Sequence, residues 1–494
     1  RSAVFVPGHC TCCLRGNPSG RRFIALLVRP KCERKIAMTH DLYGLPVTGA
    51  SDAALQGIND FIHGFISFEP KATNVMEAAG NAPDCCLVNT YTAMIWMLLE
   101  APIAPKKAAP FLAKAEAVMA TATPREQMVT HAIRAWVDGD VPKCVKICED
   151  ILADYPRDMV ALKLAQYHTF NAGDFASMLR LALKTMPAAD DIPYAHGMLA
   201  FGYEECHLLD DAETAARRAM ELRHDEPWAH HALAHIYLTR GQTAEGAAFL
   251  ESVADTWGNL NSFMHSHNWW HLALFYISAG READVVTAYD THVWGLAKDY
   301  SQDQVGAASL LARMDFAGID VGDRWADVAD HIAKRGADTV SPFLTLQYLY
   351  ALGRMGRPET ETLLTAIEDR AEDETKFDHP VWRDVAVWAA HGIAAHAAED
   401  WDDAIRFLGK ALPRMAECGG SHAQRDLFEQ IHLDALIKSG QASKAQQVLE
   451  MRRTFDPGGV PLNMLLADAY ENAGLPEQAI VAKNRAGESR AAFS

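Results

Sequence analysis

Histidine is concentrated in one stretch of the chain, and its spacing there fits ligand or metal chemistry. Ten of the 21 histidines lie within residues 196–292. In this stretch His231 and His235 are four residues apart, and so are His267 and His271. Residues four apart share one face of a helix, so each pair presents two imidazoles in the same direction. The stretch is therefore the first place where the sequence predicts a functional site.

Two kinds of chemistry fit these histidines. In the first, His235, His267 and His271 bind a divalent metal together with a carboxylate, and the metal activates water. In the second, an imidazole oriented by a carboxylate is a general base, since its ordinary pKa is about 6.5. Three acidic residues lie close enough in the repeat to supply the carboxylate: Glu204, Glu205 and Asp290. The candidate catalytic residues are His196, Glu205, His231, His235 and Asp290.

A structural interpretation of the same residues stays open. A histidine in an alanine-rich helix is more often packed or hydrogen-bonded in the core than bound to a ligand. We expect His224, His230 and His265 to have such surface or structural roles. The histidine-rich stretch indicates a divalent metal as a candidate cofactor. The sequence does not identify which metal, or whether another cofactor binds.

A second candidate site lies at residues 419–426, where two glycines precede Ser421. Ser421 is typical of an N-cap that opens a helix. Free backbone amides at that helix start, with Arg425 one turn later, suit a carboxylate or a phosphate. A capped helix with a surface pair between Arg425 and Asp426 explains the same residues, so both interpretations stand.

A repeat of 34 residues indicates which secondary-structure elements position these side chains. The spacing of 34, or twice 34, separates glycines that close one apolar-periodic segment and precede the next. These residues are Gly139, Gly173, Gly241, Gly440 and Gly474, with His207 at the intermediate position. Thirty-four is the tetratricopeptide period, and glycine suits a turn that needs a left-handed backbone.

The repeat predicts an all-α fold, a solenoid of tetratricopeptide-type helical hairpins. Valine and isoleucine do not alternate with polar residues long enough to indicate a strand. We expect one continuous solenoid over 38–494, with N-terminal helices in 50–120, regular hairpins in 124–293, less regular helices in 301–372 and C-terminal hairpins in 380–490. Stacked hairpins wind into a right-handed superhelix whose concave side is lined by the first helix of each pair.

The composition excludes some partners. The chain has 494 residues, 49% of them hydrophobic and 22% charged, and a formal net charge of −18. An acidic surface argues against nucleic acid or an anionic membrane as the main partner. Six cysteines after residue 37 lack the spacing of a disulfide framework, which is typical of reduced thiols in the cytoplasm. We therefore expect a soluble cytoplasmic protein that binds neither nucleic acid nor membranes.

The first 37 residues differ from the rest of the chain. They hold eight Lys or Arg residues against the single acidic residue Glu33. The apolar run at 23–28 is shorter than a secretory signal and far shorter than a membrane span. We expect 1–37 to be a disordered leader, or one wrongly assigned to the chain, with Met38 as the true start.

Several polar motifs of the chain, taken together and in this order, resemble the tetratricopeptide repeat protein 38 family. The motifs are His196-Gly197-Met198 with Phe201-Gly202 and Glu205, His231-x-x-x-His235, His267-Asn268-Trp269-Trp270-His271, Tyr289-Asp290-Thr291-His292, Gly322-Asp323-Arg324-Trp325, and Gly419-Gly420-Ser421 with Gln424-Arg425-Asp426. The resemblance runs from about Asp41 to the C-terminal hairpins. The resemblance implies a soluble intracellular helical-repeat protein, but it does not imply any particular biochemical activity.

Packing alone would not require the polar residues of these motifs. We therefore predict that some of them contact a ligand: Asn268, Trp270, His292, Gln424, Arg425 and Asp426. Trp270 also fits a core position, and both roles stay open.

Two functions follow from the sequence. The preferred one is a helical-repeat protein that binds an unidentified small molecule or peptide in a histidine-rich concave groove. The alternative is an enzyme, either metal-dependent or using histidine and carboxylate acid–base chemistry, with its pocket inside the superhelix. A binding groove should be long and open. An enzyme pocket should be compact, should bring carboxylates to the imidazoles and should shift their pKa values.

Overall fold

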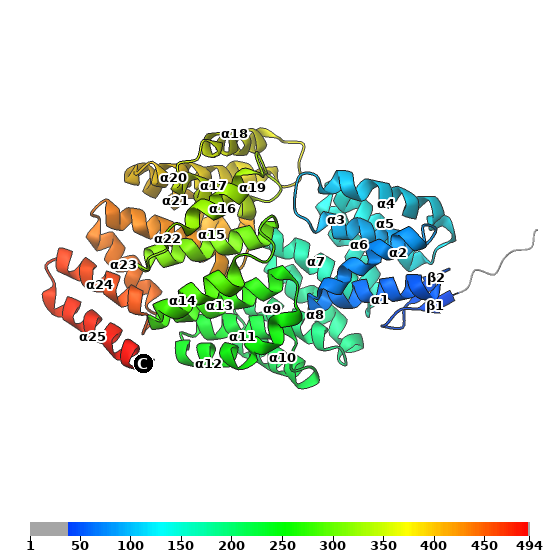
Figure 1. Ribbon diagram of the computed structural model, residues 1–494, viewed down its shortest axis with the longest axis horizontal. Helices are drawn as coiled ribbons and strands as arrows, with labels where there is room; N and C mark the ends of the chain where they lie inside the picture. The colour runs from blue at the N-terminus through cyan, green and yellow to red at the C-terminus, as the bar shows by residue number, and fades with distance from the viewer. Residues whose placement is uncertain (1–37, 493–494) are drawn as a thin grey trace, which may run out of the picture. The chain divides into compact units, whose positions relative to one another are not determined.

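The computed structural model describes residues 38–492, and consecutive helices in this range pack against one another along the chain (Figure 1). The prediction of an all-α helical-repeat fold is confirmed. The prediction for the leader at 1–37 lies outside the described residues. Within the described range, no helix combines the length and the apolar character that crossing a bilayer requires.

The helices follow one another with short connections. The N-terminal part contains α1 (Asp52–Ser67), η1 (Pro70–Thr73), α2 (Asn74–Asn81), α3 (Cys86–Met97), α4 (Ala104–Val118), η2 (Met119–Thr121), α5 (Pro124–Val137), α6 (Val141–Asp154), α7 (Met159–Asn171) and α8 (Phe175–Ala189). The middle part contains α9 (Pro193–Glu205), α10 (Leu209–Leu222), α11 (Pro227–Thr239), α12 (Thr243–Val253), η3 (Ala254–Asn259), α13 (Ser262–Ala279), α14 (Glu282–Ala288), η4 (Tyr289–Val293), α15 (Ser301–Phe316) and α16 (Arg324–Ala333).

The C-terminal part continues in the same way. It contains α17 (Pro342–Arg354), α18 (Glu359–Glu372), α19 (His379–Val381), η5 (Trp382–Ala386), α20 (Val387–Ala397), α21 (Trp401–Ala411), η6 (Leu412–Cys418), α22 (His422–Lys438), α23 (Ala442–Arg452), α24 (Val460–Asn472) and α25 (Pro476–Ala492). The segments η4 and η5 are single π-helical turns.

The turns of the 34-residue repeat have the backbone that the glycines predict. Gly173 has a φ of 69°, and a Cβ at this position would collide with the backbone carbonyl of Ala416. At the intermediate position His207 adopts the same left-handed region, with a φ of 57°. A non-glycine residue is uncommon in this region, and in the described chain Glu100 and Glu399 also adopt it at turns between helices.

A short β-hairpin precedes the helices, which the sequence did not predict. Strand β1 (Met38–His40) pairs antiparallel with β2 (Pro46–Thr48), and Met38 lies opposite Thr48. Strands of three residues are too short for alternating polarity to be visible in the sequence. The expectation that no strand is present was therefore wrong at this point.

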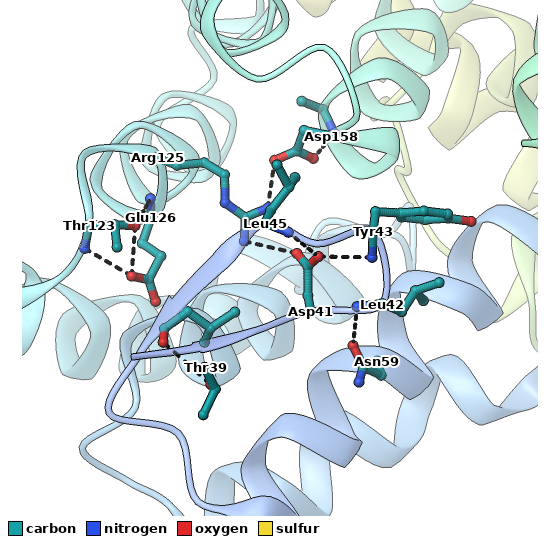
Figure 2. A network of polar contacts seen from close by, with 12 residues as sticks. Thr39, Asp41, Leu42, Tyr43, Leu45, Asn59, Thr123, Arg125, Glu126 and Asp158 are labelled. Atoms are coloured by element: carbon teal, nitrogen blue, oxygen red, sulfur yellow. Dashed lines mark hydrogen bonds and ion pairs between the residues drawn. The ribbon is translucent and has the colours of Figure 1, made fainter. Parts of the chain in front are cut away.

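A buried ion-pair network ties this hairpin to the helices (Figure 2). Arg125, near the start of α5, lies with Nη2 3.1 Å from Asp41 Oδ2 and Nη1 3.1 Å from Asp158 Oδ2. All three side chains are almost completely buried. Burial raises the pKa of Asp41 in spite of the guanidinium. The two carboxylates need Arg125, because an unpaired buried charge is strongly unfavourable.

The helices α9, α11 and α13 begin successive repeats and lie side by side (Figure 1). Helix α11 begins at the N-cap Glu226, whose carboxylate accepts hydrogen bonds from the backbone N–H groups of Trp228 and Ala229. Gly197 of α9 makes room for this cap, because a Cβ there would collide with the Glu226 carboxylate. The glycine explains why α9 and α11 approach closely enough to share a buried site.

Candidate metal centre

Four of the predicted histidines converge in the interior between α11 and α13. The ring centroids of His231 and His235 are 4.5 Å apart, and those of His235 and His271 are 4.6 Å apart. His267 lies 4.8 Å from His271 by the same measure. All four histidines are buried, and the most exposed of them, His267, is only 8% exposed. The four imidazoles, from two neighbouring repeats, therefore meet at one interior point.

Three of these histidines form the first group of donors. The Nε2 atoms of His231 and His267 are 3.0 Å apart, and His271 completes a set whose nitrogens all lie within 4.8 Å of one another. Trp228 stacks on the His231 ring and Trp270 stacks on the His267 ring. These indoles fix the orientation of the two imidazoles.

Two glutamates and two histidines form the second group. Glu204 Oε1 lies 2.7 Å from Nε2 of His422, and Glu204 Oε2 lies 3.1 Å from Nδ1 of His235. The Oε1 atom of Glu205 is 4.0 Å from the same His235 nitrogen. Glu204 and Glu205 occupy the last turn of α9, and His422 is the first residue of α22. We call the two groups together the histidine–glutamate cluster: Glu204, Glu205, His231, His235, His267, His271 and His422.

The local sequence explains how the start of α22 places His422 beside Glu204. Ser421 is the N-cap of α22, and with Gln424 it forms a capping box in which each side chain accepts from the other's backbone N–H. This fixes the direction in which the helix starts. The His422 side chain therefore points from the first turn of α22 to Glu204 at the end of α9.

The second group carries opposite charges inside the protein. Burial works to raise the pKa of Glu204, but His235 and His422 hold it well below its usual range. Burial, and after it the charge of Glu204, raise the pKa of Glu205 to about 8. Burial works to lower the pKa of His422, but Glu204 raises it to about 8. In the second group a carboxylate with a lowered pKa, Glu204, therefore lies between two imidazoles and beside a carboxyl group with a raised pKa, Glu205.

The first group is neutral. Burial lowers the pKa of His267 to about 3 and holds the pKa of His231 and His271 well below the usual range. Neutral imidazoles have free lone pairs, which is the form that binds a metal.

Many donor atoms of the cluster are buried without a hydrogen-bond partner in the described part of the chain. This holds for both oxygens of Glu205, both ring nitrogens of His271, Nδ1 of His231 and Nε2 of His235. Buried polar atoms are nearly always paired, and leaving one unpaired costs about 1–3 kcal/mol. Imidazole nitrogens and carboxylate oxygens at these separations are the donors that divalent transition metals use.

Two of the predicted catalytic residues, His196 and Asp290, do not belong to the cluster, so the prediction that they join it was wrong. His292, a predicted ligand contact, also lies outside the cluster. His196 lies in the first turn of α9, and its Nε2 is 2.9 Å from the carbonyl of Asp190. The glutamates follow about two turns later, which is roughly 12 Å along the helix. Asp290 pairs with Arg324 at 2.6 Å, and its side chain is 47% exposed. His292 stacks on Trp269, with ring centroids 3.7 Å apart.

The predicted ligand contacts have other partners in the structure. Arg425 donates to the carbonyl of Gly420, and Asp426 pairs with Arg452 at 2.5 Å instead of with Arg425. Trp270 stacks on His267, and the Arg313 guanidinium lies over the Trp270 ring. Asn268 is buried, and its amide has no hydrogen-bond partner among residues 38–492. Ligand binding by these residues, and anion binding at the start of α22, stay predictions.

A narrow pocket reaches the cluster beside His267. It has a volume of about 10 Å³, which is space for about one water molecule. Its walls are mainly polar and uncharged, from Phe263, Ser266, His267, Trp270, Gln302, Val305, Gly306, Ser309, Gln347 and Gln424. In the second group, the His422 side chain is 24% exposed.

Comparisons with known proteins found solved structures of low similarity to this chain. No family model matches the chain. A structure of the human IFIT1 dimer with m7Gppp-AAAA is 12% identical, covers 89% of this chain and 95% of its own, and has a TM-score of 0.41. The structure of Naa15/Naa10 bound to HypK-THB is 14% identical over 87% and 68%, with a TM-score of 0.24. The P58(IPK) TPR domain is 11% identical over 74% and 93%, with a TM-score of 0.21. The resemblance to one particular tetratricopeptide family stays a prediction.

Proposed function

We propose that this helical-repeat protein binds a divalent transition metal in the histidine–glutamate cluster and is a metal-dependent enzyme. The observation that carries the proposal is the convergence of seven metal-binding side chains from four helices, with buried donor atoms that have no hydrogen-bond partner among the described residues. Carboxylates accompany the imidazoles, as the enzyme alternative requires.

A nearby histidine shows what a structural role looks like in this protein. His230 is on α11, directly before His231, and it is completely buried. Its Nε2 lies 2.8 Å from the carbonyl of His224, and its Nδ1 accepts a hydrogen bond from the Trp257 indole at 3.2 Å. Both nitrogens are satisfied. In His271 neither ring nitrogen has a hydrogen-bond partner within residues 38–492, which packing alone does not explain.

The donor set indicates the class of metal and the chemistry. Five imidazoles and two carboxylates, without a thiolate, suit zinc, iron, manganese, cobalt or nickel more than calcium or magnesium, which prefer oxygen ligands. Such a metal lowers the pKa of a bound water and makes it a nucleophile near neutral pH. The pocket beside His267 has the volume for about one water molecule. Hydrolysis is the reaction class that this donor set supports best.

The burial of the cluster favours this function over a long binding groove. A peptide in an open groove would need exposed side chains along several repeats, whereas His231, His235 and His271 are at most 1% exposed. The polar pocket beside His267 has room for about one water molecule, so it does not support the small-molecule form of the binding prediction.

The test is the metal content of the full-length chain, purified without chelator and measured by inductively coupled plasma mass spectrometry. We expect near-stoichiometric zinc, iron, manganese, cobalt or nickel in the wild type. The variant His267→Gln/His271→Gln should lose it, and His224→Gln, an exposed histidine outside the cluster, should keep it. Wild-type protein without metal, both as purified and after incubation with these ions followed by dialysis, would contradict the proposal.

A further inference from the structure

We propose that the histidine–glutamate cluster holds two metal ions in subsites of different chemistry. The first, the imidazole subsite, consists of His231, His267 and His271. The second, the glutamate subsite, consists of Glu204, Glu205, His235 and His422. The proposal rests on the metal-binding function proposed above and adds the number of ions and the ligands of each.

The arrangement of the donor atoms divides the cluster in this way. Within each subsite, one atom from every side chain lies within 4.8 Å of the others. Ligands bound to one ion at about 2.0–2.2 Å are at most about 4.4 Å apart, so each subsite needs only small side-chain adjustments to close on an ion. The short donor contacts are inside the subsites: 3.0 Å between His231 and His267, and 2.7 Å between His422 and Glu204.

One ion cannot use all seven side chains. Zinc in proteins has about four ligands, and an octahedral metal has six, some of which are usually water. A single ion at either subsite would leave the donors of the other subsite buried and unpaired. In the imidazole subsite these are both nitrogens of His271, and in the glutamate subsite both oxygens of Glu205. Two ions give His271 in one subsite and Glu205 in the other a metal to bind.

His235 lies at the boundary between the subsites. Its Nδ1 faces Glu204, while its ring lies 4.5 Å from the His231 ring and 4.6 Å from the His271 ring. Its Nε2 has no hydrogen-bond partner in the described range. The subsites are therefore adjacent, as in two-metal enzymes whose ions are about 3.5–4 Å apart.

The subsites differ in charge and in donor type. The imidazole subsite offers three neutral nitrogens, a set suited to zinc, copper, nickel or cobalt. The glutamate subsite offers two nitrogens and up to two negative charges, which favours a harder ion such as manganese or iron and strengthens binding of any dication. We therefore expect two binding events with unequal affinities.

The experiment is a titration of metal-free, full-length protein with Co²⁺, with bound ions counted by native mass spectrometry. Wild type should bind two ions. His231→Gln/His271→Gln should keep only the ion of the glutamate subsite, and Glu204→Gln/Glu205→Gln only the ion of the imidazole subsite. His224→Gln is the matched control and should bind two. Circular dichroism checks that each variant is folded.

The outcomes separate the two proposals. One ion in the wild type and none in either double variant would overturn the two-ion assignment and leave a single metal centre. Two ions that survive in both double variants would place them outside the cluster and overturn both proposals. No ion in the wild type would overturn the proposed function itself. If a double variant does not fold, the single variants His271→Gln and Glu205→Gln remove no hydrogen bond, and each should weaken one binding event at least about 10-fold while leaving the other unchanged.

Discussion

Metal removal should lower the thermal stability of this protein by an amount that the cluster allows us to work out. Six donor atoms, on Glu205, His231, His235 and His271, are buried without a hydrogen-bond partner in the described chain. Each of these four side chains offers one ligand atom to a metal, so at the lower end of the usual cost, about 1 kcal/mol each, a bound metal relieves about 4 kcal/mol.

Binding linkage gives a similar figure. A metal present at roughly a thousand to ten thousand times its dissociation constant stabilises the folded state by about 4–5.5 kcal/mol. For a chain of 494 residues, an unfolding entropy of about 2.1 cal/mol/K per residue amounts to about 1 kcal/mol per kelvin. We therefore expect the melting temperature of metal-saturated protein to exceed that of chelated protein by about 4–6 °C.

Differential scanning calorimetry at pH 7.5 measures this shift, with one sample dialysed against chelator and another saturated with Zn²⁺. His224→Gln should show the wild-type shift, and His267→Gln/His271→Gln should show a clearly smaller one. Equal melting temperatures for chelated and metal-saturated wild type would refute the reasoning, because the unpaired donors would then be satisfied without a metal.

Three further predictions concern the framework of the site. Gly197→Ala should destabilise the fold by about 1–3 kcal/mol in urea unfolding, because the new Cβ collides with the Glu226 cap of α11. Arg125→Met should cost about 3–5 kcal/mol in the same assay, because it leaves two buried carboxylates unpaired. Burial raises the pKa of Asp303 to about 7. Because the folded protein holds the Asp303 proton more tightly than the unfolded chain does, the contribution of Asp303 to the free energy of unfolding falls as the pH rises from about 4 to 7. Above about pH 7 this contribution levels off. Asp303→Asn should remove this contribution, so the stability of wild type relative to the variant should fall by up to about 4 kcal/mol between pH 4 and pH 8.

Matched variants control these predictions. Gly80→Ala places its Cβ where no other atom lies within 4 Å, so it should not destabilise. Arg134→Met removes a partly exposed pair with Glu116 and should cost at most about 1 kcal/mol. Equal costs for the buried and exposed arginine variants would show that the ion-pair network does not tie the hairpin down. A pH-independent difference between wild type and Asp303→Asn would contradict the burial argument.

Spacing along the chain predicted the histidine pairs, because their positions depend on local rules. Within a pair the helical period is enough, and the 34-residue repeat then brings the His231 pair beside the His267 pair. His422 follows no such rule. His422 is 187 residues from His235 in the sequence. Only the packing of α22 against distant helices brings His422 Nε2 to 3.2 Å from His235 Nδ1. Its sole local signal was the capping motif beside it.

Burial was the other feature that the sequence did not reveal. The stretch around His231 is apolar on both sides of the helix, with alanines at 229, 232 and 234 that are all fully buried. A helix of this kind has no polar face to mark a groove, so the pattern cannot separate a concave wall from the interior. For the same reason His196 was grouped with the cluster, although its own helix carries it two turns away from Glu204.

The most direct measurement is an anomalous difference map from crystals of the full-length protein, collected at the absorption edge of the metal that elemental analysis identifies. We predict one peak bonded to His231, His267 and His271, and a second bonded to the glutamate subsite, each at about 2.0–2.2 Å from its ligands. A map without a peak in the cluster, with ordered waters on the unpaired atoms of His271 and Glu205, would contradict the proposal that this protein is a metalloenzyme.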